Sequence, residues 1–310
     1  MKTRKQKKQK NKKTRKQELE IYKYMDLTII TVTWNVKDFV RDNFKNIYEN
    51  TKNIEFEIYA VDNDSKDGTA EMIRNEFPNV HLIANNYNAG FAKANNQAIK
   101  LAKGRYILLL NPDMRVLPET FEKMVKWMDK HKNAGVAGCH LIKENGETVP
   151  HVRRYPKFLD QLAIVLKLPH IFPSILNNYL YKDFDYNKEA IVDSIRGSFF
   201  MIRREVIEKL GGLDERYFIW FEEVDYCKQV KNAGFEIMYT PEVKCVDFVG
   251  ASFALVKRGK TQEYFCDSML KYFKKWHSTW QYFILKLAWP IGIGITIIGA
   301  KLNFKTKAKT

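Results

Sequence analysis

Strand-like and helix-like segments alternate four times between residues 27 and 131, and this alternation restricts the fold more than any other feature of the chain. Short apolar runs, among them Tyr106–Leu110, are each followed by a stretch with helical spacing. This order is typical of a parallel sheet whose strands are joined by crossover helices. We therefore expect an α/β fold with a mostly parallel central sheet and flanking helices. The expected strands are residues 27–34, 56–61, 80–84 and 106–110, and the expected helices are residues 37–49, 67–76, 91–103 and 118–131.

The second half of the chain is less regular. Its pattern predicts strands at residues 194–202, 236–239 and 244–248 and a helix at residues 222–233. Residues 151–188 give no clear interpretation.

Polar side chains follow all four of the first expected strands. In parallel sheets ligands bind beyond the carboxyl ends of the strands, where these side chains would gather. Asp62 is placed to accept hydrogen bonds from a base or a ribose, whereas Asp64 fits a helix cap equally well. The residues at the four strand ends include Thr33, Asn35, Asp62, Asp64, Asn85, Asn86, Asn111 and Asp113.

Two groups of acidic residues are candidates for chemistry. Asp113, with the amide of Asn111 beside it, suits a hard cation such as Mg²⁺ that a diphosphate helps to hold. An ordinary Asn-Pro-Asp turn explains the same residues. Glu222, Glu223 and Asp225 crowd the start of an expected helix, which suits either the helix dipole or a general base of raised pKa. The segments taken singly leave both alternatives open.

The net charge of +16 comes from the two ends of the chain. Residues 1–16 contain ten Lys or Arg and no acid, and residues 301–310 contain four lysines and no acid. A basic end indicates either nucleic acid or an anionic membrane surface as the partner. We interpret residues 1–24 as a disordered basic arm without a signal peptide. The four cysteines are far apart, which predicts neither a zinc site nor disulfides and fits a reducing cytosol.

Residues 282–300 are apolar apart from Lys286. The uninterrupted part, residues 287–300, is shorter than the roughly 20 residues of a spanning helix, which favours an interfacial segment. A single span counted from Tyr282, a core helix and a dimer contact stay open as alternatives. We expect residues 279–310 to form a membrane-associated helix and a basic tail at the cytoplasmic face of the cell membrane.

Seven blocks together resemble glycosyltransferase family 2, whose members invert the sugar and have the GT-A fold, and in particular its rhamnosyltransferase-like members. Their order and spacing agree over residues 27–277, so the expected GT-A domain covers residues 25–278. The blocks are ITVTWN (30–35), VDNDSKDGT (61–69), NAGFAKANN (88–96), LNPD (110–113), RGSFFMIRR (196–204), GGLDE (211–215) and FEEVDYC (221–227).

The resemblance implies roles for these residues. Thr33, Asn35 and Asp62 would hold the base and ribose of the nucleotide, while Gly90, Ala92 and Asn95 would line the diphosphate and sugar of the donor. Asp64 and Asn111 are further candidates for binding the donor. Asp113 would bind Mg²⁺ or Mn²⁺. The acidic block would supply the base that deprotonates the acceptor hydroxyl, with Glu222 and Asp225 beside Glu223.

The chain departs from the family pattern at two positions. Glu223 stands where relatives usually have the catalytic Asp, so its carboxylate sits on a longer arm. Asp247 stands where many relatives have a His before a Gly-x-Ser, and an Asp there could still bind a hard metal.

The sequence thus predicts a metal-dependent glycosyltransferase. It would move rhamnose or a similar sugar from a nucleotide-diphosphate sugar to a glycan or polyprenyl-linked acceptor at an anionic membrane surface. A dinucleotide oxidoreductase is excluded, since residues 34–37 lack the glycines of its phosphate loop. A catalytically inactive relative and a basic nucleic-acid-binding protein remain alternatives, although we expect no nucleic acid. A homodimer stays open.

Overall fold

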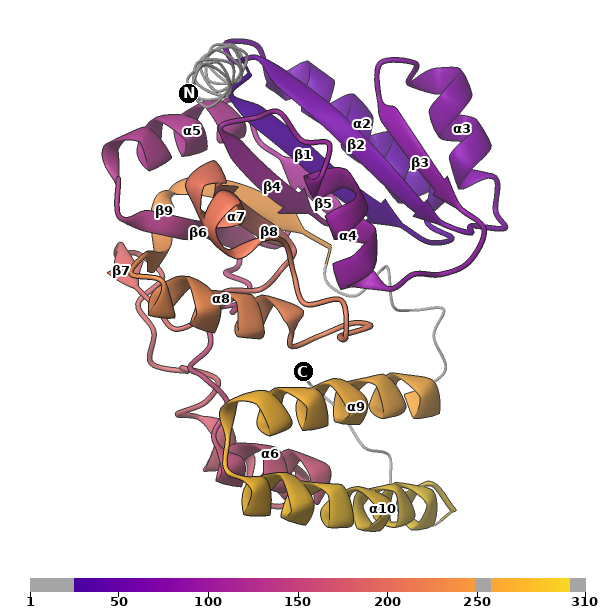
Figure 1. The fold of residues 1–310 in the computed structure, drawn as a ribbon, viewed down its shortest axis with the longest axis vertical. Helices are drawn as coiled ribbons and strands as arrows, with labels where there is room; N and C mark the ends of the chain where they lie inside the picture. Colours follow the sequence, from indigo (N-terminus) through magenta and orange to yellow (C-terminus); the bar gives the residue numbers. More distant parts are fainter. Residues whose placement is uncertain (1–24, 249–257, 302–310) are drawn as a thin grey trace, which may run out of the picture.

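A computed structural model of the chain describes residues 25–248 and 258–301, and Figure 1 shows their path. The strands are β1 (Leu27–Thr33), β2 (Phe56–Asn63), β3 (His81–Asn85), β4 (Tyr106–Leu110), β5 (Met114–Val116), β6 (Ala134–Ile142), β7 (Ala190–Ile191), β8 (Phe199–Arg203) and β9 (Glu236–Asp247). The helices are α2 (Lys37–Asn50), α3 (Thr69–Glu76), α4 (Phe91–Ile99), α5 (Thr120–Lys130), α6 (Phe158–Val165), α7 (Arg204–Leu210), α8 (Glu222–Asn232), α9 (Arg258–Trp276) and α10 (Thr279–Lys301), with 3₁₀ turns η1 (Leu168–His170) and η2 (Pro173–Leu176).

Within these residues one nine-stranded sheet has the order β3-β2-β1-β4-β8-β6-β9-β5, and β7 pairs with β9. Strands β1 to β4 run parallel, with Thr33 of β1 opposite Asp62 of β2. Strand β8 is antiparallel to both β4 and β6, and β5 is antiparallel to β9. The expected α/β architecture with a mostly parallel sheet is confirmed.

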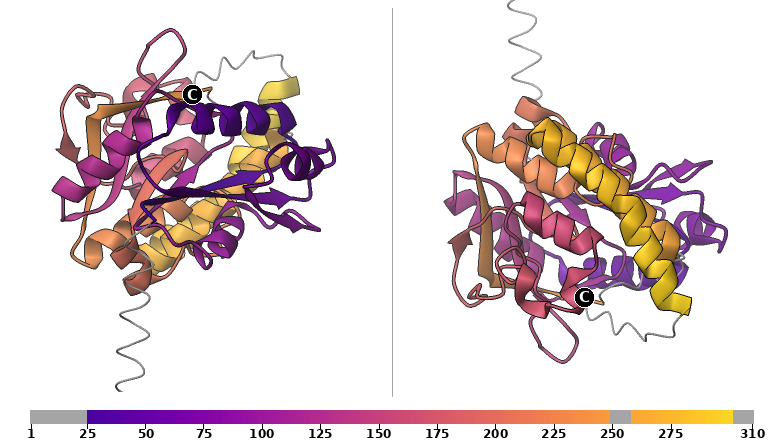
Figure 2. Two further views of the ribbon diagram at one scale, coloured as in Figure 1. Left: turned by 90° about the horizontal axis from the view of Figure 1, so that it is seen from above. Right: turned by 90° about the horizontal axis from the view of Figure 1, so that it is seen from below.

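Helices cover both faces of the sheet, as Figure 2 shows from above and below. The central strands are rich in β-branched and aliphatic residues that are buried on both sides, which a sheet between two helical layers requires. Ile29 belongs to a buried cluster that includes residues of α2, α3 and α5, whereas its neighbour Ile30 belongs to a second cluster with residues of α4, α7 and α8. Alternate residues of one strand therefore build two separate cores.

The antiparallel strands bring additional residues to the carboxyl edge of the parallel ones. The amide of Asn111, which follows β4, donates to the carbonyl of Ser198 just before β8 (3.0 Å). The amide of Phe248, which follows β9, donates to the carbonyl of Asp113 just before β5 (3.1 Å). The beginnings of β5 and β8 thus lie at the same edge as the ends of β4 and β9.

A third layer lies below the sheet in Figure 1 and consists of α6, α9 and α10. Its core includes Val165, Met269, Phe273 and Leu285, and it also contains Tyr217 from the loop before α8. None of the helices that the structure describes is both long and apolar enough to cross a membrane. The alternative that residues 282–300 cross a membrane once is therefore not supported. Residues 1–24 lie outside the described part of the chain, and the domain boundaries remain predictions.

The structure differs from the expected elements mainly in the second half. The two strands expected at residues 236–239 and 244–248 are one strand, β9, whose pairing with β6 shifts between Thr240 and Lys244, a stretch that contains Pro241. Proline has no N–H to donate, so the hydrogen-bonded pattern is interrupted there without ending the strand. Strand β6, helices α6, α7 and α9, and the short strands β5 and β7 were not anticipated.

Candidate active site

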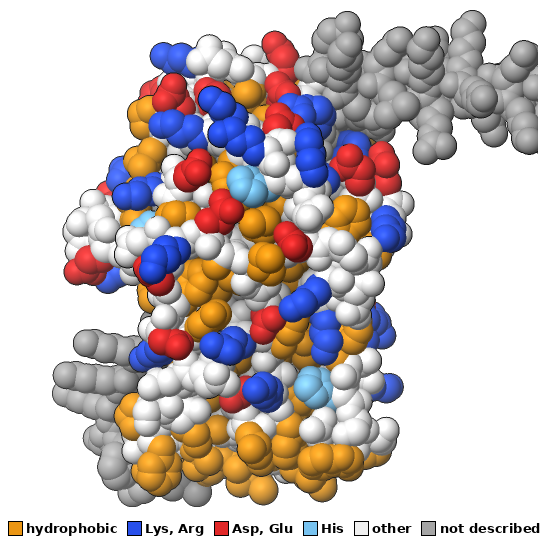
Figure 3. All heavy atoms as spheres, turned by 90° about the vertical axis from the view of Figure 1, so that its left-hand side faces the viewer, with side chains coloured by type: hydrophobic (Ala, Val, Ile, Leu, Met, Phe, Trp, Pro, Cys, Tyr) orange, Lys and Arg blue, Asp and Glu red, His pale blue; other side chains and the backbone are white. Residues whose placement is uncertain are grey.

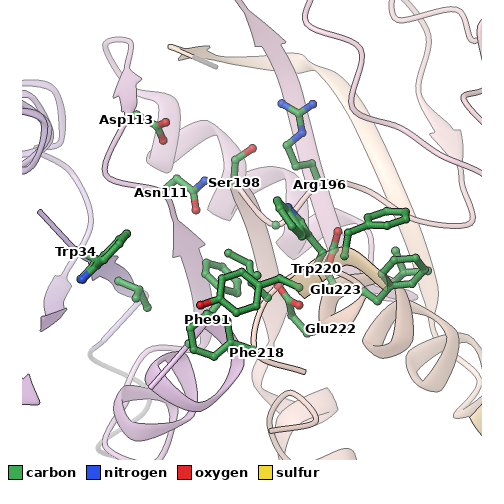
Figure 4. A pocket seen from close by; sticks show the side chains of 18 of the residues that line it. Trp34, Phe91, Asn111, Asp113, Arg196, Ser198, Phe218, Trp220, Glu222 and Glu223 are labelled. Atoms are coloured by element: carbon green, nitrogen blue, oxygen red, sulfur yellow. The ribbon is translucent and has the colours of Figure 1, made fainter. Parts of the chain in front are cut away.

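A cavity of about 1140 Å³ opens at the carboxyl edge of the sheet, between the strand ends, the segment that leads into α8 and residues of α9. It brings together residues that are up to 233 positions apart, from Val32 to Phe265. Figure 4 shows Asp113 and Asn111 on one side of it and Glu222 and Glu223 on the other, with Arg196 and Ser198 between them. The candidate residues that line the cavity are Thr33, Gly90, Asn111, Asp113, Glu222, Glu223 and Asp247.

Two aspartates mark one side of the cavity. Asp113 and Asp247 are each 4% exposed and come from neighbouring antiparallel strands, because Met114 lies opposite Asp247 in the register of β5 and β9. Both supply carboxylate oxygens, which are the ligands that hard divalent cations prefer. No group of three or more His, Cys, Asp or Glu that could hold a metal occurs within residues 25–248 and 258–301. A cation here would need further oxygen ligands from a substrate.

The other side carries two adjacent acids in the first turn of α8. Burial and the neighbouring Glu223 raise the pKa of Glu222 well above its ordinary value. Burial also raises the pKa of Glu223, while the positive charge of Arg196 opposes this shift. One oxygen of each carboxylate (Oε2) is buried without a hydrogen-bond partner. A buried carboxylate of raised pKa is a stronger base than one in water, and this is the property that proton abstraction needs.

Arg196 connects the two sides. Its guanidinium lies 3.3 Å from the carboxylate of Asp247, and its charge also acts on Glu223. The sequence placed Arg196 in a matching block but gave it no role. The arginine precedes β8, and the antiparallel direction of β8 carries it to this edge of the sheet.

The chain enters α8 through two consecutive residues in the left-handed region, Trp220 (φ 63°) and Phe221 (φ 67°). Bulky residues rarely adopt this conformation, and such strain is found mostly where function requires it. Phe221 is held by ring contacts with Phe265 and Tyr272 of α9 (centroids 5.5 and 5.6 Å apart). The packing of α9 thus supports the backbone that presents Glu222.

Gly90 is a position where only glycine fits. It has a φ of 79°, and a Cβ atom there would collide with the backbone carbonyl of Phe218. The next amide, that of Phe91, donates to the same carbonyl (2.7 Å). Asn63, at the end of β2, donates to the carbonyl of Gly90 (3.2 Å). The small residue therefore lets the loop before α8 close over the start of α4, beside the cavity.

Three candidate residues for the nucleotide, Asp62, Asn35 and Asp64, are not among the residues that line the cavity. Asp62 is buried and accepts hydrogen bonds from the hydroxyl of Thr33 (2.9 Å) and the amide of Ser65 (3.0 Å). Asn35 receives the amide of Lys66 (2.6 Å) on its side-chain oxygen. Asp64 pairs with the ammonium group of Lys66 (2.6 Å). Of the four candidates for the nucleotide only Thr33, whose hydroxyl Asp62 fixes, lines the cavity directly.

Three further candidates also lie outside the lining. Ala92 is in the core between α4 and the sheet, and Asn95 donates to the carbonyl of Phe91 (2.9 Å). Asp225 is fully buried and accepts hydrogen bonds from Gln229 (2.7 Å) and Lys275 (2.8 Å). The side chain of Asp225 is therefore engaged with α9, unlike those of Glu222 and Glu223.

Sequence reasoning missed a basic and aromatic part of the site. His151, Arg153 and Tyr179 line the cavity and come from the region that had no interpretation. Burial lowers the pKa of His151 to about 3, so its ring is uncharged at neutral pH. Tyr264 and Phe265 line the cavity from α9, and Tyr264 stacks on Phe218 (centroids 4.5 Å apart). No motif in the sequence pointed to these residues.

The chain is thus an α/β protein with a large cavity at the carboxyl edge of its sheet, and Asp113, Asp247, Glu222 and Glu223 are among the residues that line this cavity. The model of the family described as Glycosyl transferase family 2 matches residues 28–211, which is more than half of the chain, and the chain belongs to this family.

Curated relatives include the N-acetylglucosaminyl-diphospho-decaprenol L-rhamnosyltransferase of Mycobacterium tuberculosis, 25% identical over 199 residues. That alignment covers 60% of this chain and 64% of the relative, so the chain spans less than two thirds of its length. The rhamnosyltransferase WbbL of Escherichia coli K12 is 24% identical over 230 residues, covering 71% of this chain and 82% of WbbL.

Among solved structures, the mannosyltransferase PcManGT from Pyrobaculum calidifontis, in complex with GDP-Man and Mn²⁺, is similar with a TM-score of 0.54 and 19% identity. The match covers 89% of this chain and 75% of PcManGT. At this level of identity the likeness concerns the fold alone, which is GT-A-like.

Proposed function

We propose that the chain is an inverting glycosyltransferase that moves a sugar from a nucleotide-diphosphate sugar to a hydroxyl group of an acceptor. The observation that carries the proposal is the placement of two acidic pairs on two sides of one cavity, Asp113 with Asp247 and Glu222 with Glu223. An in-line displacement requires such a separation, because the leaving group departs from one side of the sugar while the attacking oxygen arrives from the other.

In the proposed reaction Glu223 takes the proton of the acceptor hydroxyl, and the oxygen forms a bond to the anomeric carbon of the donor sugar. The bond between that carbon and the diphosphate oxygen breaks, and its electron pair leaves with the nucleoside diphosphate. One displacement of this kind inverts the configuration. The raised pKa of Glu223 supports its assignment as the base, because the carboxylate then binds the abstracted proton more strongly.

Asp113 and Asp247 are the residues that would hold Mg²⁺ or Mn²⁺. Their oxygen donors fit a hard cation, and the diphosphate of the donor would supply the ligands that the protein lacks. A bound cation would neutralise charge on the departing diphosphate. Arg196, which is already paired with Asp247, would add a second positive charge at the same place.

For the nucleotide we propose a position against Thr33 and Trp34 at the end of β1. Asp62 would act through Thr33, whose hydroxyl it fixes, and Asn35 and Asp64 would hold the following loop in shape. Gly90, Asn95 and Ala92 would shape the start of α4 beside the diphosphate and sugar, together with Asn111.

We further propose rhamnose or a similar sugar as the group transferred, because the curated relatives described above are named as rhamnosyltransferases. The name of the mycobacterial relative describes an acceptor linked through a diphosphate to a polyprenyl chain. An acceptor of this class fits an enzyme at the cytoplasmic face of a membrane, and the basic ends of the chain fit an anionic membrane surface.

The test is a panel of dTDP-, UDP- and GDP-linked sugars, each incubated with the full chain and a lipid-linked or soluble glycan acceptor. We expect one donor class to release its nucleoside diphosphate in step with formation of a product of inverted anomeric configuration. Glu223→Gln should abolish most of this turnover, whereas Glu119→Gln, at an exposed ion pair outside the cavity, should leave it intact.

Two outcomes favour the alternatives. Donor binding without turnover for any acceptor indicates a catalytically inactive relative. Nucleic-acid binding that disappears on removal of residues 1–16, together with no affinity for any nucleotide sugar, indicates a basic nucleic-acid-binding protein.

A further inference from the structure

Helix α10 is apolar on both of its long faces. Its inner face carries Leu285 and Ala288, which are buried in the core shared with α6 and α9. Gly292 lies so close to α6 that a Cβ atom would collide with the carbonyl of Val165, so the two backbones are in direct contact there. This inner face explains how α10 is attached to the rest of the protein.

The outer face of α10 is equally apolar, but no described residue covers it. Leu287 is 71% exposed and Ile291 is 57% exposed, and they follow Phe283 at the spacing of one helix face. A surface helix normally turns polar residues toward water, and contiguous exposed apolar patches usually mark a contact surface. Figure 3 shows hydrophobic side chains gathered along the end of the molecule where α10 lies.

Two other segments extend this surface. Leu159, at the start of α6, is 71% exposed, and its neighbour Phe158 is in ring contact with Trp280 of α10 (centroids 5.0 Å apart). The segment from η1 to η2 packs against α6 and exposes Ile171, Phe172 and Ile175. We call the exposed apolar residues of these segments the apolar base; they are Leu159, Ile171, Phe172, Ile175, Trp280, Phe283, Ile284, Leu287, Ile291, Ile293 and Ile295.

The charge of the segments that build the apolar base is almost all positive, since Asp160, beside Leu159 in α6, is their one acidic residue. Residues 161–182 contain no Asp or Glu, and neither do residues 268–310. The second of these segments contains eight lysines, including Lys274 and Lys286, whose side chains are exposed. Two copies of this surface in symmetric contact would bring like charges together. An anionic bilayer instead offers an apolar boundary and negative headgroups at the same depth.

We propose that the apolar base docks the protein onto the surface of a bilayer that contains anionic phospholipids, with α10 lying in the plane of the interface. The proposal rests on the proposed function and adds the surface and orientation through which the enzyme meets its lipid-linked acceptor. Helix α9 packs on α10 and carries Tyr264 and Phe265 into the cavity. Docking would therefore leave only α10 between the bilayer surface and α9, the helix that lines the cavity with Tyr264 and Phe265.

The test measures partition of the full-length protein onto vesicles by flotation, with phosphatidylcholine alone or mixed with phosphatidylglycerol. We expect binding that requires phosphatidylglycerol and falls at least ~10-fold in Leu287→Glu/Ile291→Glu, because two charges would enter the apolar boundary. Lys286→Gln should reduce binding less. The matched control is Leu101→Glu, which replaces an exposed leucine (53%) outside the apolar base.

A second readout locates the helix. All four native cysteines are buried, so Leu287→Cys can be labelled selectively with an environment-sensitive fluorophore. A blue shift on addition of vesicles, absent for a label at Leu101→Cys, supports docking. Unchanged vesicle binding in the double variant overturns the proposal, as does a wild-type dimer that Leu287→Glu/Ile291→Glu converts to a monomer.

Different results would refute the proposed enzymatic function and the proposed docking surface. The double variant should retain turnover on a soluble acceptor analogue and lose it only on acceptor embedded in vesicles. Docking without any sugar transfer would refute the enzymatic proposal and leave the docking surface standing. Sugar transfer by a protein that does not bind vesicles would refute the docking surface alone.

Discussion

Lys275 of α9 donates a hydrogen bond of 2.8 Å to Asp225 of α8, a carboxylate that is 0% exposed. The indole nitrogen of Trp276 donates to the other oxygen of the same carboxylate (2.5 Å). Asp225 lies two residues beyond Glu223, so the helix that carries the proposed base is tied to the helix that lies on α10. The position of Glu223 therefore depends on the third layer of the molecule as well as on the sheet.

We expect Asp225→Asn to lower the free energy of unfolding by about 1.5–3 kcal/mol, since it removes hydrogen bonds to a buried charged group. Asp267→Asn is the control, because its pair with Lys271 is partly exposed, with side chains that are 48% and 36% accessible, and its loss should change stability by less than about 1 kcal/mol. Chemical denaturation measures both. If Asp225→Asn keeps full stability and loses kcat, the sequence-based hypothesis of a catalytic Asp225 is supported instead.

The base is tested by isosteric substitution. Glu223→Gln keeps the shape of the side chain and removes its basicity, so kcat should fall by roughly 10²–10⁴-fold while donor affinity stays constant. Glu222→Gln should reduce kcat less. Glu223→Asp shortens the arm and should also impair turnover, though less than Gln does. A normal kcat in Glu223→Gln, with an inactive Glu222→Gln, would assign the base to Glu222.

The pH dependence follows from the shifted carboxyl groups. Because burial raises the pKa of Glu223, the base becomes protonated at a higher pH than an ordinary glutamate, and activity should decline there on the acidic side. Arg196 lowers the same pKa, so Arg196→Gln should move this acidic limb of the kcat/KM profile to still higher pH. Arg115→Gln, at an exposed ion pair with Glu144, should leave the limb in place. If the acidic limb does not move in Arg196→Gln, this arginine does not influence the pKa of the base.

The raised pKa of Glu222 should also make the stability of the fold depend on pH. A carboxyl group whose pKa is raised by folding favours the folded state while protonated, and this contribution is lost as pH rises through the folded-state pKa. Glu222→Gln should therefore raise Tm relative to the native chain at alkaline pH, and the gain should shrink toward acidic pH. Thermal melts across the pH range measure the difference. A constant difference at all pH values would mean that the charge of Glu222 is not the cause.

The metal is tested by chelation and by substitution. EDTA should abolish transfer by the native chain, and Mg²⁺ or Mn²⁺ should restore it. Asp113→Ala should be inactive but folded, with a Tm close to that of the native protein, because Asp113 lies at a strand end. Full turnover in excess EDTA would refute the assignment and leave Arg196 as the source of positive charge near Asp247.

The first four strands and their helices could be predicted because their patterns are local. Tyr106–Leu110, for example, is a continuous apolar run between polar ends, and it is β4. Strand β6 was missed because it contains Gly135 and Gly138, which weaken the strand pattern. The structure explains both glycines, since a Cβ atom would lie 2.6 Å from Phe235 at the first and 2.8 Å from Ile195 at the second. These contacts come from distant segments, which no local pattern reveals.

In the candidate site, too, some residues could be predicted from local patterns and others depend on contacts between distant segments. The acids at strand ends and at the start of α8 could be placed from motif and position, and Asp113, Asp247, Glu222 and Glu223 do line one cavity. Sequence position alone did not reveal that Asp62 acts on Thr33 rather than on the cavity itself. Nor did it reveal Arg153, which reaches the cavity only because residue 153 bridges to Ser194 in the folded chain.

The order of the strands has a consequence for synthesis of the protein on the ribosome. Strand β8 inserts between β4 and β6, and β9 inserts between β6 and β5, so early strands are flanked by later ones. Strands β4 and β6 remain without β8 until Arg203 has been translated, and β5 and β6 remain without β9 until Asp247 has been translated. Until then the nascent chain would expose unpaired apolar strand edges, and such edges are prone to aggregation. A fragment that ends at residue 211 would lack β9 permanently and should aggregate, although it contains the whole segment that matches the family.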